Sequence, residues 1–205
     1  MKKRSLKIFA LMALLMVLVA SCSKDNDLKE SVFISDPDDY NMPAYSEWGY
    51  NTFGVYYDRD IFVSNNQEVP VKVIVNDSAT VFLFNGTTNN YDYYYYSNNM
   101  TMSIVLKGFQ PDSYLDLTAF NDSIIDLAIP GVSVYITKDT GQLNTKILSG
   151  KLHFKRVQNL FVDDEQKEVI LSGTFDFKAQ INNEPVTFSD GRFDVGVNED
   201  NFYKL

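Results

Sequence analysis

The sequence predicts an all-β fold: a single antiparallel β-sandwich, or a partly open β-barrel, of about ten short strands. Aromatic residues make up 14% of the 205 residues, and together with many Val, Ile and Thr they favour strands over helices. Apolar and polar residues alternate with a period of two in several segments, which indicates strands with one buried and one solvated face, and hence antiparallel pairing. No amphipathic helical pattern in the sequence is longer than two turns.

The first element in the chain is a predicted signal peptide, residues 1–21. It opens with positive residues and continues with an uncharged apolar run over residues 8–20. This run is too short to cross a hydrocarbon layer about 30 Å thick, which needs about 20 residues. A positive start followed by a short apolar run is typical of a secretory signal that is removed from the mature protein.

The apolar run ends in Val19-Ala20-Ser21-Cys22, which resembles the bacterial lipobox. The resemblance implies cleavage between Ser21 and Cys22 and attachment of lipid to Cys22, the one cysteine of the chain. With a single cysteine, no intrachain disulfide can form. We therefore expect a lipoprotein that is attached to its partner, a membrane, through lipidated Cys22. Several acyl chains give a stable anchor, whereas a single chain is marginal.

Residues 22–46 are predicted to be the lipid anchor and a flexible acidic tether, since they are polar and show no apolar period. Ser23-Lys24-Asp25-Asn26-Asp27 resembles the signal that sends Bacteroidetes lipoproteins to the outer face of the outer membrane. We expect an outer-membrane lipoprotein exposed on the cell surface. A periplasm-facing location is the alternative.

Residues 47–205 are predicted to form the antiparallel β domain. Asn76-Asp77-Ser78, Asn85-Gly86 and Asn182-Asn183 are predicted turns between its strands. Four sets of apolar residues repeat at every second position: Val69, Val71, Val73 and Val75; Met100, Met102, Ile104 and Leu106; Val132, Val134 and Ile136; and Leu171, Phe175, Phe177, Ala179 and Ile181.

The last predicted strand contains a change of phase. Val186 and Phe188 share one face, whereas the later apolar positions, Phe193 and Val195, are shifted by one residue. Because a single extra residue moves every later side chain to the other face, we expect a β-bulge at Asp190-Gly191.

Three segments resemble a family of Bacteroidetes lipoproteins without an assigned activity. They are Asn51-Thr52-Phe53-Gly54, Leu171-Ser172-Gly173-Thr174-Phe175-Asp176-Phe177 and Asp190-Gly191-Arg192-Phe193-Asp194. The resemblance covers roughly residues 48–197 and implies a β fold and an envelope location, but no site. Arg192 between two aspartates suits charge pairing along one strand face.

Charge excludes one class of partner. Removal of the signal peptide leaves 14 basic and 27 acidic residues, a formal charge of −13. Such a chain is repelled by phosphate backbones, so we expect no nucleic-acid binding.

No catalytic residue, metal site or cofactor is predicted. His153, the one histidine, is expected to be solvated between Lys151 and Lys155, and no serine follows a nucleophile-elbow pattern. The acidic clusters, residues 36–39 and 163–165, lack the glycine and spacing of a calcium loop. We therefore expect a protein that is not an enzyme. A small hydrolase with two carboxylates is the least favoured alternative.

A run of tyrosines is the predicted binding surface. Exposed tyrosines favour recognition, and sugars can stack on their rings. The candidate residues are Tyr91, Tyr93, Tyr94, Tyr95 and Tyr96. We expect a non-catalytic binding or structural role in the cell envelope, with glycan or another envelope protein as the partner. A lipocalin-like carrier of a small apolar ligand is the alternative, and it would need an internal cavity.

Two serines are candidate O-glycosylation sites. Asp77-Ser78-Ala79 and Asp122-Ser123-Ile124 resemble the short Bacteroidetes acceptor motif, in which Asp precedes Ser or Thr and an apolar residue follows. Both Ser78 and Ser123 lie at predicted turns, where a modifying enzyme could reach them.

Overall fold

The computed structural model describes residues 30–64, 69–89, 97–138 and 141–205, which form an all-β domain built on one large, open antiparallel sheet. This confirms the predicted fold class. The described strands and the one short 3₁₀ helix are β1 (Thr52–Tyr57), β2 (Asp60–Val63), β3 (Val71–Asn76), β4 (Ala79–Asn89), β5 (Ser97–Lys107), η1 (Tyr114–Phe120), β6 (Ser123–Asp126), β7 (Val132–Lys138), β8 (Gly141–Gln142), β9 (Thr145–Val162), β10 (Glu165–Ile181), β11 (Glu184–Val197) and β12 (Phe202–Lys204).

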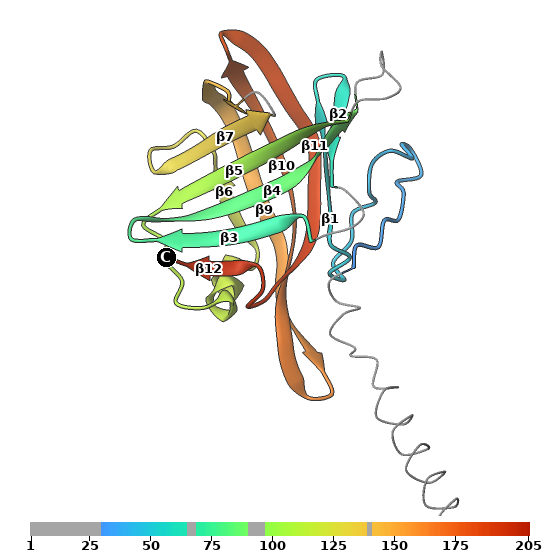
Figure 1. Ribbon diagram of the computed structural model, residues 1–205, viewed down its shortest axis with the longest axis vertical. Coiled ribbons are helices and arrows are strands. Elements are labelled where there is room, and N and C mark those ends of the chain that lie inside the picture. The colour runs from blue at the N-terminus through green and yellow to red at the C-terminus, as the bar shows by residue number, and fades with distance from the viewer. Residues whose placement is uncertain (1–29, 65–68, 90–96, 139–140) are drawn as a thin grey trace, which may run out of the picture.

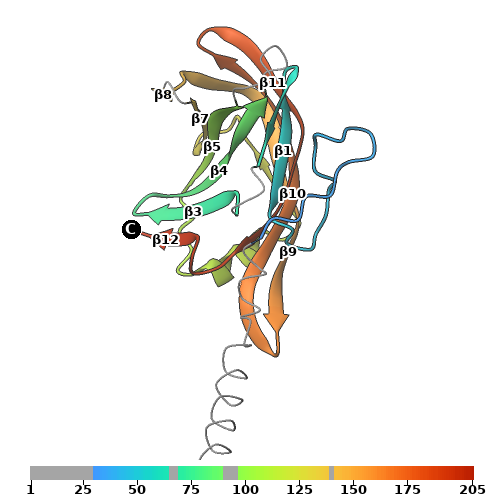
Figure 2. The same cartoon turned by 45° about the vertical axis from the view of Figure 1, so that its right-hand side comes forward.

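The sheet has the strand order β6-β9-β10-β11-β1-β2-β4-β5-β7-β8, and it curls on itself without closing (Figures 1 and 2). Strand β4 has two partners on one edge, with β3 along its first half and β2 along its second half. Strand β12 extends the sheet beyond β3 and makes the one parallel pair among the described strands. Strands β9 and β10, of 18 and 17 residues, are longer than the short strands expected from sequence.

The concave side of the sheet is filled by aromatic rings from most of its strands. Phe53 stacks on Phe84 with ring centroids 4.9 Å apart, and Phe177 stacks on Phe188 at 4.2 Å. Offset and edge-to-face aromatic pairs each add about 0.5–1.5 kcal/mol beyond the burial of their surface. The largest fully buried aromatic side chains are Phe53, Phe62, Phe82, Phe154, Phe175, Phe177, Phe188 and Phe193.

The predicted alternation is confirmed in the core. Val71, Val73 and Val75 are buried while Lys72 between them is exposed. The same holds for β5, whose buried side chains are Met100, Met102, Ile104 and Leu106, and for β10, whose buried side chains include Phe175, Phe177, Ala179 and Ile181. Helix η1 contributes buried Leu117 and Phe120, and the Phe120 ring stacks on Phe154 at 4.8 Å.

The predicted bulge in the last long strand is confirmed. Between the pairs Phe175–Gly191 and Phe177–Phe188, one residue of β10 faces two residues of β11, Ser189 and Asp190. Asp190 takes a left-handed backbone conformation with φ of 52°. The extra residue restores Phe188 and Phe193 to the same buried side of the sheet.

The turn predicted at Asn85-Gly86 is wrong, because both residues lie inside β4. Gly86 is needed there for close approach rather than for a turn. A Cβ atom on Gly86 would lie 2.2 Å from the carbonyl oxygen of Val63, where β2 takes over from β3 as the neighbour of β4. A glycine in a sequence can indicate either a turn or a close approach of two backbones within a sheet, so Gly86 alone does not distinguish the two.

Residues 30–50, here called the N-terminal strap, lie over the convex face of β1, β10 and β11 (Figure 2). Met42 is fully buried, and its neighbour Pro43 covers Gly54 so closely that a Cβ there would lie 2.5 Å from Pro43 Cδ. Most of the strap falls in the segment expected to be a flexible tether. The strap shows no apolar period in the sequence, because polar groups provide much of its attachment to the sheet.

Within the described residues, no helix is of the length and apolar character required to cross a bilayer.

Candidate functional site

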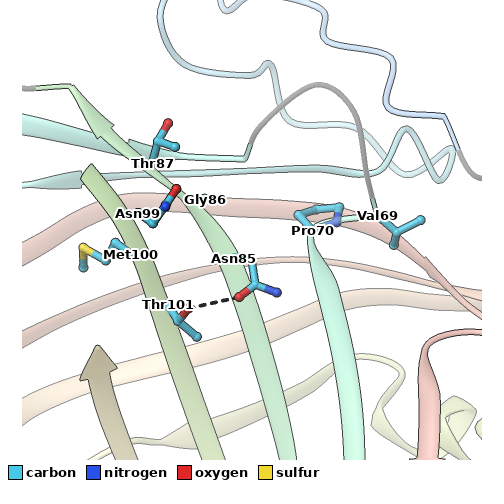
Figure 3. Close-up of a pocket in the computed structure, with 8 residues that line it drawn as sticks. All are labelled: Val69, Pro70, Asn85, Gly86, Thr87, Asn99, Met100 and Thr101. Atoms are coloured by element: carbon cyan, nitrogen blue, oxygen red, sulfur yellow. Dashed lines mark hydrogen bonds between the residues drawn. The ribbon is translucent and has the colours of Figure 1, made fainter. Parts of the chain in front are cut away.

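A groove of about 190 Å³ lies over the outer side of β4 and β5 (Figure 3). Its floor comes from two facing strand segments, and its wall comes from the residues that lead into β3. The lining residues are Val69, Pro70, Asn85, Gly86, Thr87, Asn99, Met100 and Thr101.

Strand alternation places the polar side chains of this groove. Asn85 and Thr101 are directly opposite each other in the antiparallel pair, and both are half-buried, whereas Phe84 and Met102 beside them are buried on the concave side. The Thr101 hydroxyl donates to Asn85 Oδ1 at 3.0 Å, which fixes the orientation of the amide (Figure 3). Because Oδ1 faces Thr101, the amide nitrogen of Asn85 lies at the opposite end of the fixed amide, where it can act as a hydrogen-bond donor.

Gly86 contributes only backbone to the groove. The Val63 backbone fills the space where its Cβ would stand. The polar lining is therefore two amides and two hydroxyls beside an aliphatic wall of Val69 and Pro70, and no lining residue carries a charge.

A second polar cluster lies between the strap and the sheet and is centred on Asp194, which is 1% exposed. Its carboxylate accepts hydrogen bonds from the backbone amides of Trp48 (3.1 Å), Gly49 (2.9 Å) and Tyr50 (3.1 Å). The hydroxyls of Ser46 and Ser172 donate to the same carboxylate. Five donors thus satisfy one buried charge, which is the condition under which a buried carboxylate is tolerated.

Glu168 lies beside this cluster and is also 1% exposed. Burial raises the pKa of its carboxyl to about 7, and the charge of Asp194 contributes in the same direction, while a hydrogen bond with Asn198 opposes it. The carboxyl rests directly on the backbone of β11, since a Cβ on Gly196 would lie 2.4 Å from Glu168 Oε2. In the folded protein the Glu168 carboxyl therefore loses its proton near neutral pH.

Two further contacts attach the middle of the strap. Asp36 pairs with the Arg192 guanidinium, and the Tyr56 hydroxyl donates to Asp39 at 2.7 Å. The amide of Asp38 and the guanidinium of Arg192 lower the pKa of Asp36, and the hydrogen bond to Asp39 raises the pKa of Tyr56 to about 12. The ion-pair partner of Arg192 is thus Asp36 of the strap, and not a neighbour on its own strand face as expected from sequence.

The residues predicted from sequence lie in different places. The lipidation and cleavage residues, Cys22 and Ser21, lie outside the described residues. So do the predicted binding tyrosines, Tyr91, Tyr93, Tyr94, Tyr95 and Tyr96.

The two candidate glycosylation serines differ in access. Ser78 is exposed in the turn between β3 and β4, where the Asn76 side chain accepts its hydroxyl hydrogen bond at 3.1 Å. Ser123 begins β6, and its Oγ is buried without a hydrogen-bond partner in the described part of the chain.

The expectation of a solvated His153 is wrong. Strand β6 pairs with β9 at this point, with Ile124 opposite His153, so the ring is only 26% exposed. Its Nε2 lies 3.6 Å from Asp122 Oδ1 and has no hydrogen-bond partner among the described residues. No hydrogen bond in this part of the structure joins His153 to a serine hydroxyl, so the geometry is not that of an activated nucleophile.

Within residues 30–64, 69–89, 97–138 and 141–205, no group of three His, Cys, Asp or Glu side chains could hold a metal ion. No known protein family, curated protein or solved structure matches the chain.

Sequence reasoning missed both the groove and the Asp194 cluster. The signal for the groove was present in the facing polar residues of β4 and β5, but Asn85-Gly86 resembles a turn. Asp194 stands in a short sequence motif, but its strap donors are more than 140 residues away in sequence. Such contacts follow from topology and not from local spacing.

Proposed function

We propose that this chain is a lipoprotein anchored through Cys22 to the outer membrane, with its β domain on the cell surface, and that the domain binds neutral glycans without acting on them. The observation that carries the proposal is the uncharged polar groove formed by Asn85, Thr87, Asn99 and Thr101. The lipobox and the export signal carry the anchor and the location.

The groove chemistry favours a neutral polyhydroxyl ligand. Amide and hydroxyl groups can each donate to and accept from sugar hydroxyls, while the aliphatic wall of Val69 and Pro70 suits the apolar face of a ring. An anionic ligand would find no cationic partner among the lining residues, and such charge-assisted bonds are about twice as strong as neutral ones. The groove volume of about 190 Å³ is smaller than that of pockets for drug-sized ligands, which have about 300–1,000 Å³. One sugar unit is therefore the expected occupant.

The positions of the buried carboxylates support a binding role over hydrolysis. A glycosidase pair needs two carboxyl groups flanking an accessible bond. Asp194 and Glu168 are both 1% exposed and are covered by the strap, and Asp194 is already occupied by five donors. The phenylalanine-filled interior likewise gives no support to the alternative of an internal apolar ligand.

Affinity electrophoresis in neutral polysaccharides tests the groove. Asn85→Ala combined with Thr101→Val should weaken retention about tenfold or more, because each lost ligand hydrogen bond is worth about 0.5–1.5 kcal/mol. Ser103→Ala is the matched control, since Ser103 is half-buried on the same strand and lies outside the groove. Retention that is unchanged in the double variant, or that occurs only with anionic polysaccharides, would contradict the proposal.

The tyrosine segment is tested separately. A Tyr-to-Ala series at Tyr91, Tyr93, Tyr94, Tyr95 and Tyr96 should abolish retention on polysaccharide while leaving the protein folded, if these rings bind glycan as the sequence predicts. Unchanged retention would remove the segment from the proposal and leave the groove.

The anchor and location have their own measurements. Intact mass of the membrane-extracted protein should show acylation at Cys22 and loss of residues 1–21. Protease treatment of intact cells should remove the protein, whereas full protection would indicate the periplasm-facing alternative.

A further inference from the structure

The strap carries an unusual share of exposed apolar surface. Of the twelve exposed large hydrophobic side chains in the described residues, four lie within the 21 residues of the strap. These are Val32 (47% exposed), Ile34 (49%), Tyr40 (79%) and Trp48 (73%). Single exposed hydrophobic residues need no explanation, but several on one short segment mark a surface that contacts something.

The attachment of the strap to the sheet directs these side chains outward. The amides of Trp48 and Gly49 both donate to Asp194, so the backbone is held against the sheet while the indole ring projects away from it. Val32 donates its amide to the carbonyl of Tyr50, two residues from Trp48, and the carbonyl of Ile34 accepts from the amide of Ala44. The exposed residues at 32 and 34 therefore stand on one side of an extended segment.

Charge does not oppose an apolar contact at Trp48. Its acidic neighbour Glu47 is paired with Arg156 at 3.2 Å, and Lys155 lies over the Tyr45 ring at 4.7 Å. An exposed tryptophan is typical of the membrane interface, where its amphipathic ring lies at the level of the headgroups.

The length of chain before the strap decides which partner lies within reach. Seven residues separate Cys22 from Glu30, the first described residue. Eight extended residues span at most about 29 Å, so lipid on Cys22 keeps the start of the strap within that distance of the bilayer surface. Val32 and Ile34 follow Glu30 by two and four residues.

We infer that the strap is a membrane-docking surface, on which Val32, Ile34 and Trp48 contact the interface of the bilayer that holds the anchor. This rests on the proposed lipidation of Cys22. It deepens the proposed function, because docking through the strap gives the domain a defined orientation on the membrane instead of free rotation on a tether.

The chain has one tryptophan, so its fluorescence reports on Trp48 alone. The experiment uses the full lipidated protein in phosphatidylethanolamine–phosphatidylcholine vesicles with and without lipids brominated in their acyl chains. We expect Trp48 emission to shift to shorter wavelength, to be quenched by the brominated lipid, and to lose most of its quenching by acrylamide. The double variant Val32→Ser, Ile34→Ser should reduce the lipid quenching.

The matched control moves the reporter to another exposed position. Trp48→Phe combined with Tyr135→Trp places the indole on β7, where Tyr135 is 39% exposed. This reporter should remain accessible to acrylamide and unquenched by lipid. Equal lipid quenching of both reporters would overturn the inference.

The two proposals fail in different ways. Protein that is acylated and pellets with vesicles, but keeps a water-exposed Trp48, overturns the docking surface and leaves the anchor intact. Trp48 shielding that depends on protein concentration and not on lipid would assign the surface to a second copy and overturn membrane docking. Protein without acylation overturns the anchor, and the inference with it.

Discussion

Replacement of Glu168 by glutamine should make the stability of the domain less dependent on pH. Glu168 is 1% exposed, and burial raises the pKa of its carboxyl from 4.5 to about 7. The folded protein therefore holds this proton more tightly than the unfolded chain does. For a carboxyl whose pKa is raised by folding, stability is fully present below pH 4.5 and is lost as the pH rises through about 7.

The size of the effect follows from the two ionisation constants. A tenfold change in an ionisation constant is worth about 1.4 kcal/mol, so the rise from 4.5 to about 7 corresponds to a loss of about 3 kcal/mol of unfolding free energy by pH 8. Glu168→Gln keeps the shape of the neutral acid without its titration. The variant should match the parent at pH 4.5 and exceed it by about 3 kcal/mol at pH 8.

The assay is urea denaturation of both proteins between pH 4.5 and 9, followed by circular dichroism. The slope of the unfolding free energy against urea concentration serves as a check that both proteins expose the same surface on unfolding. A difference between the proteins that stays constant across this range would refute the assignment of a titrating, buried Glu168. A parent that is more stable than the variant at pH 8 would refute the sign.

Two other substitutions separate the strap from the core. Asp194→Ala removes the acceptor for the amides of Trp48, Gly49 and Tyr50, and should cost about 2–4 kcal/mol and speed hydrogen exchange at these amides, with Asp194→Asn intermediate. Phe193→Ala should cost about 3–5 kcal/mol in urea denaturation, because Phe193 is 2% exposed among other rings. Exchange unaltered in the first variant, or a cost below about 1 kcal/mol in the second, would contradict these contacts.

The strands were predictable because their signal is local. A period of two places Val71, Val73 and Val75 on one face whatever lies opposite, and the sheet then buries that face. The bulge at Asp190-Gly191 was predictable for the same reason, since a phase change within one strand is visible in its own residues.

The strap and the groove were not predictable because their partners are distant in sequence. Residues 30–46 look like a polar tether, and Asp36 and Asp39 reveal their role only when Arg192 and Tyr56 are placed beside them by the sheet. Gly86 shows the converse problem. Its local signal is that of a turn, and only the pairing of β4 with both β2 and β3 explains why glycine is required inside a strand.

The two faces of the sheet are held by different interactions. The concave face is closed mainly by the burial of phenylalanine rings, whereas the strap is held by buried Met42 and by directional bonds to Asp194 and Arg192. With the proposed lipid on Cys22, a force on the anchor would pass through residues 30–50 to contacts that include Asp194 and Arg192 on β11, near the middle of the sheet and not at its edge. A strap that came away would expose its polar contacts together with Met42 and leave the aromatic core in place. The bonds to Asp194 that help to keep the strap on the sheet also hold the backbone of Trp48, so loss of this carboxylate should weaken both the attachment of the strap and the proposed contact with the membrane.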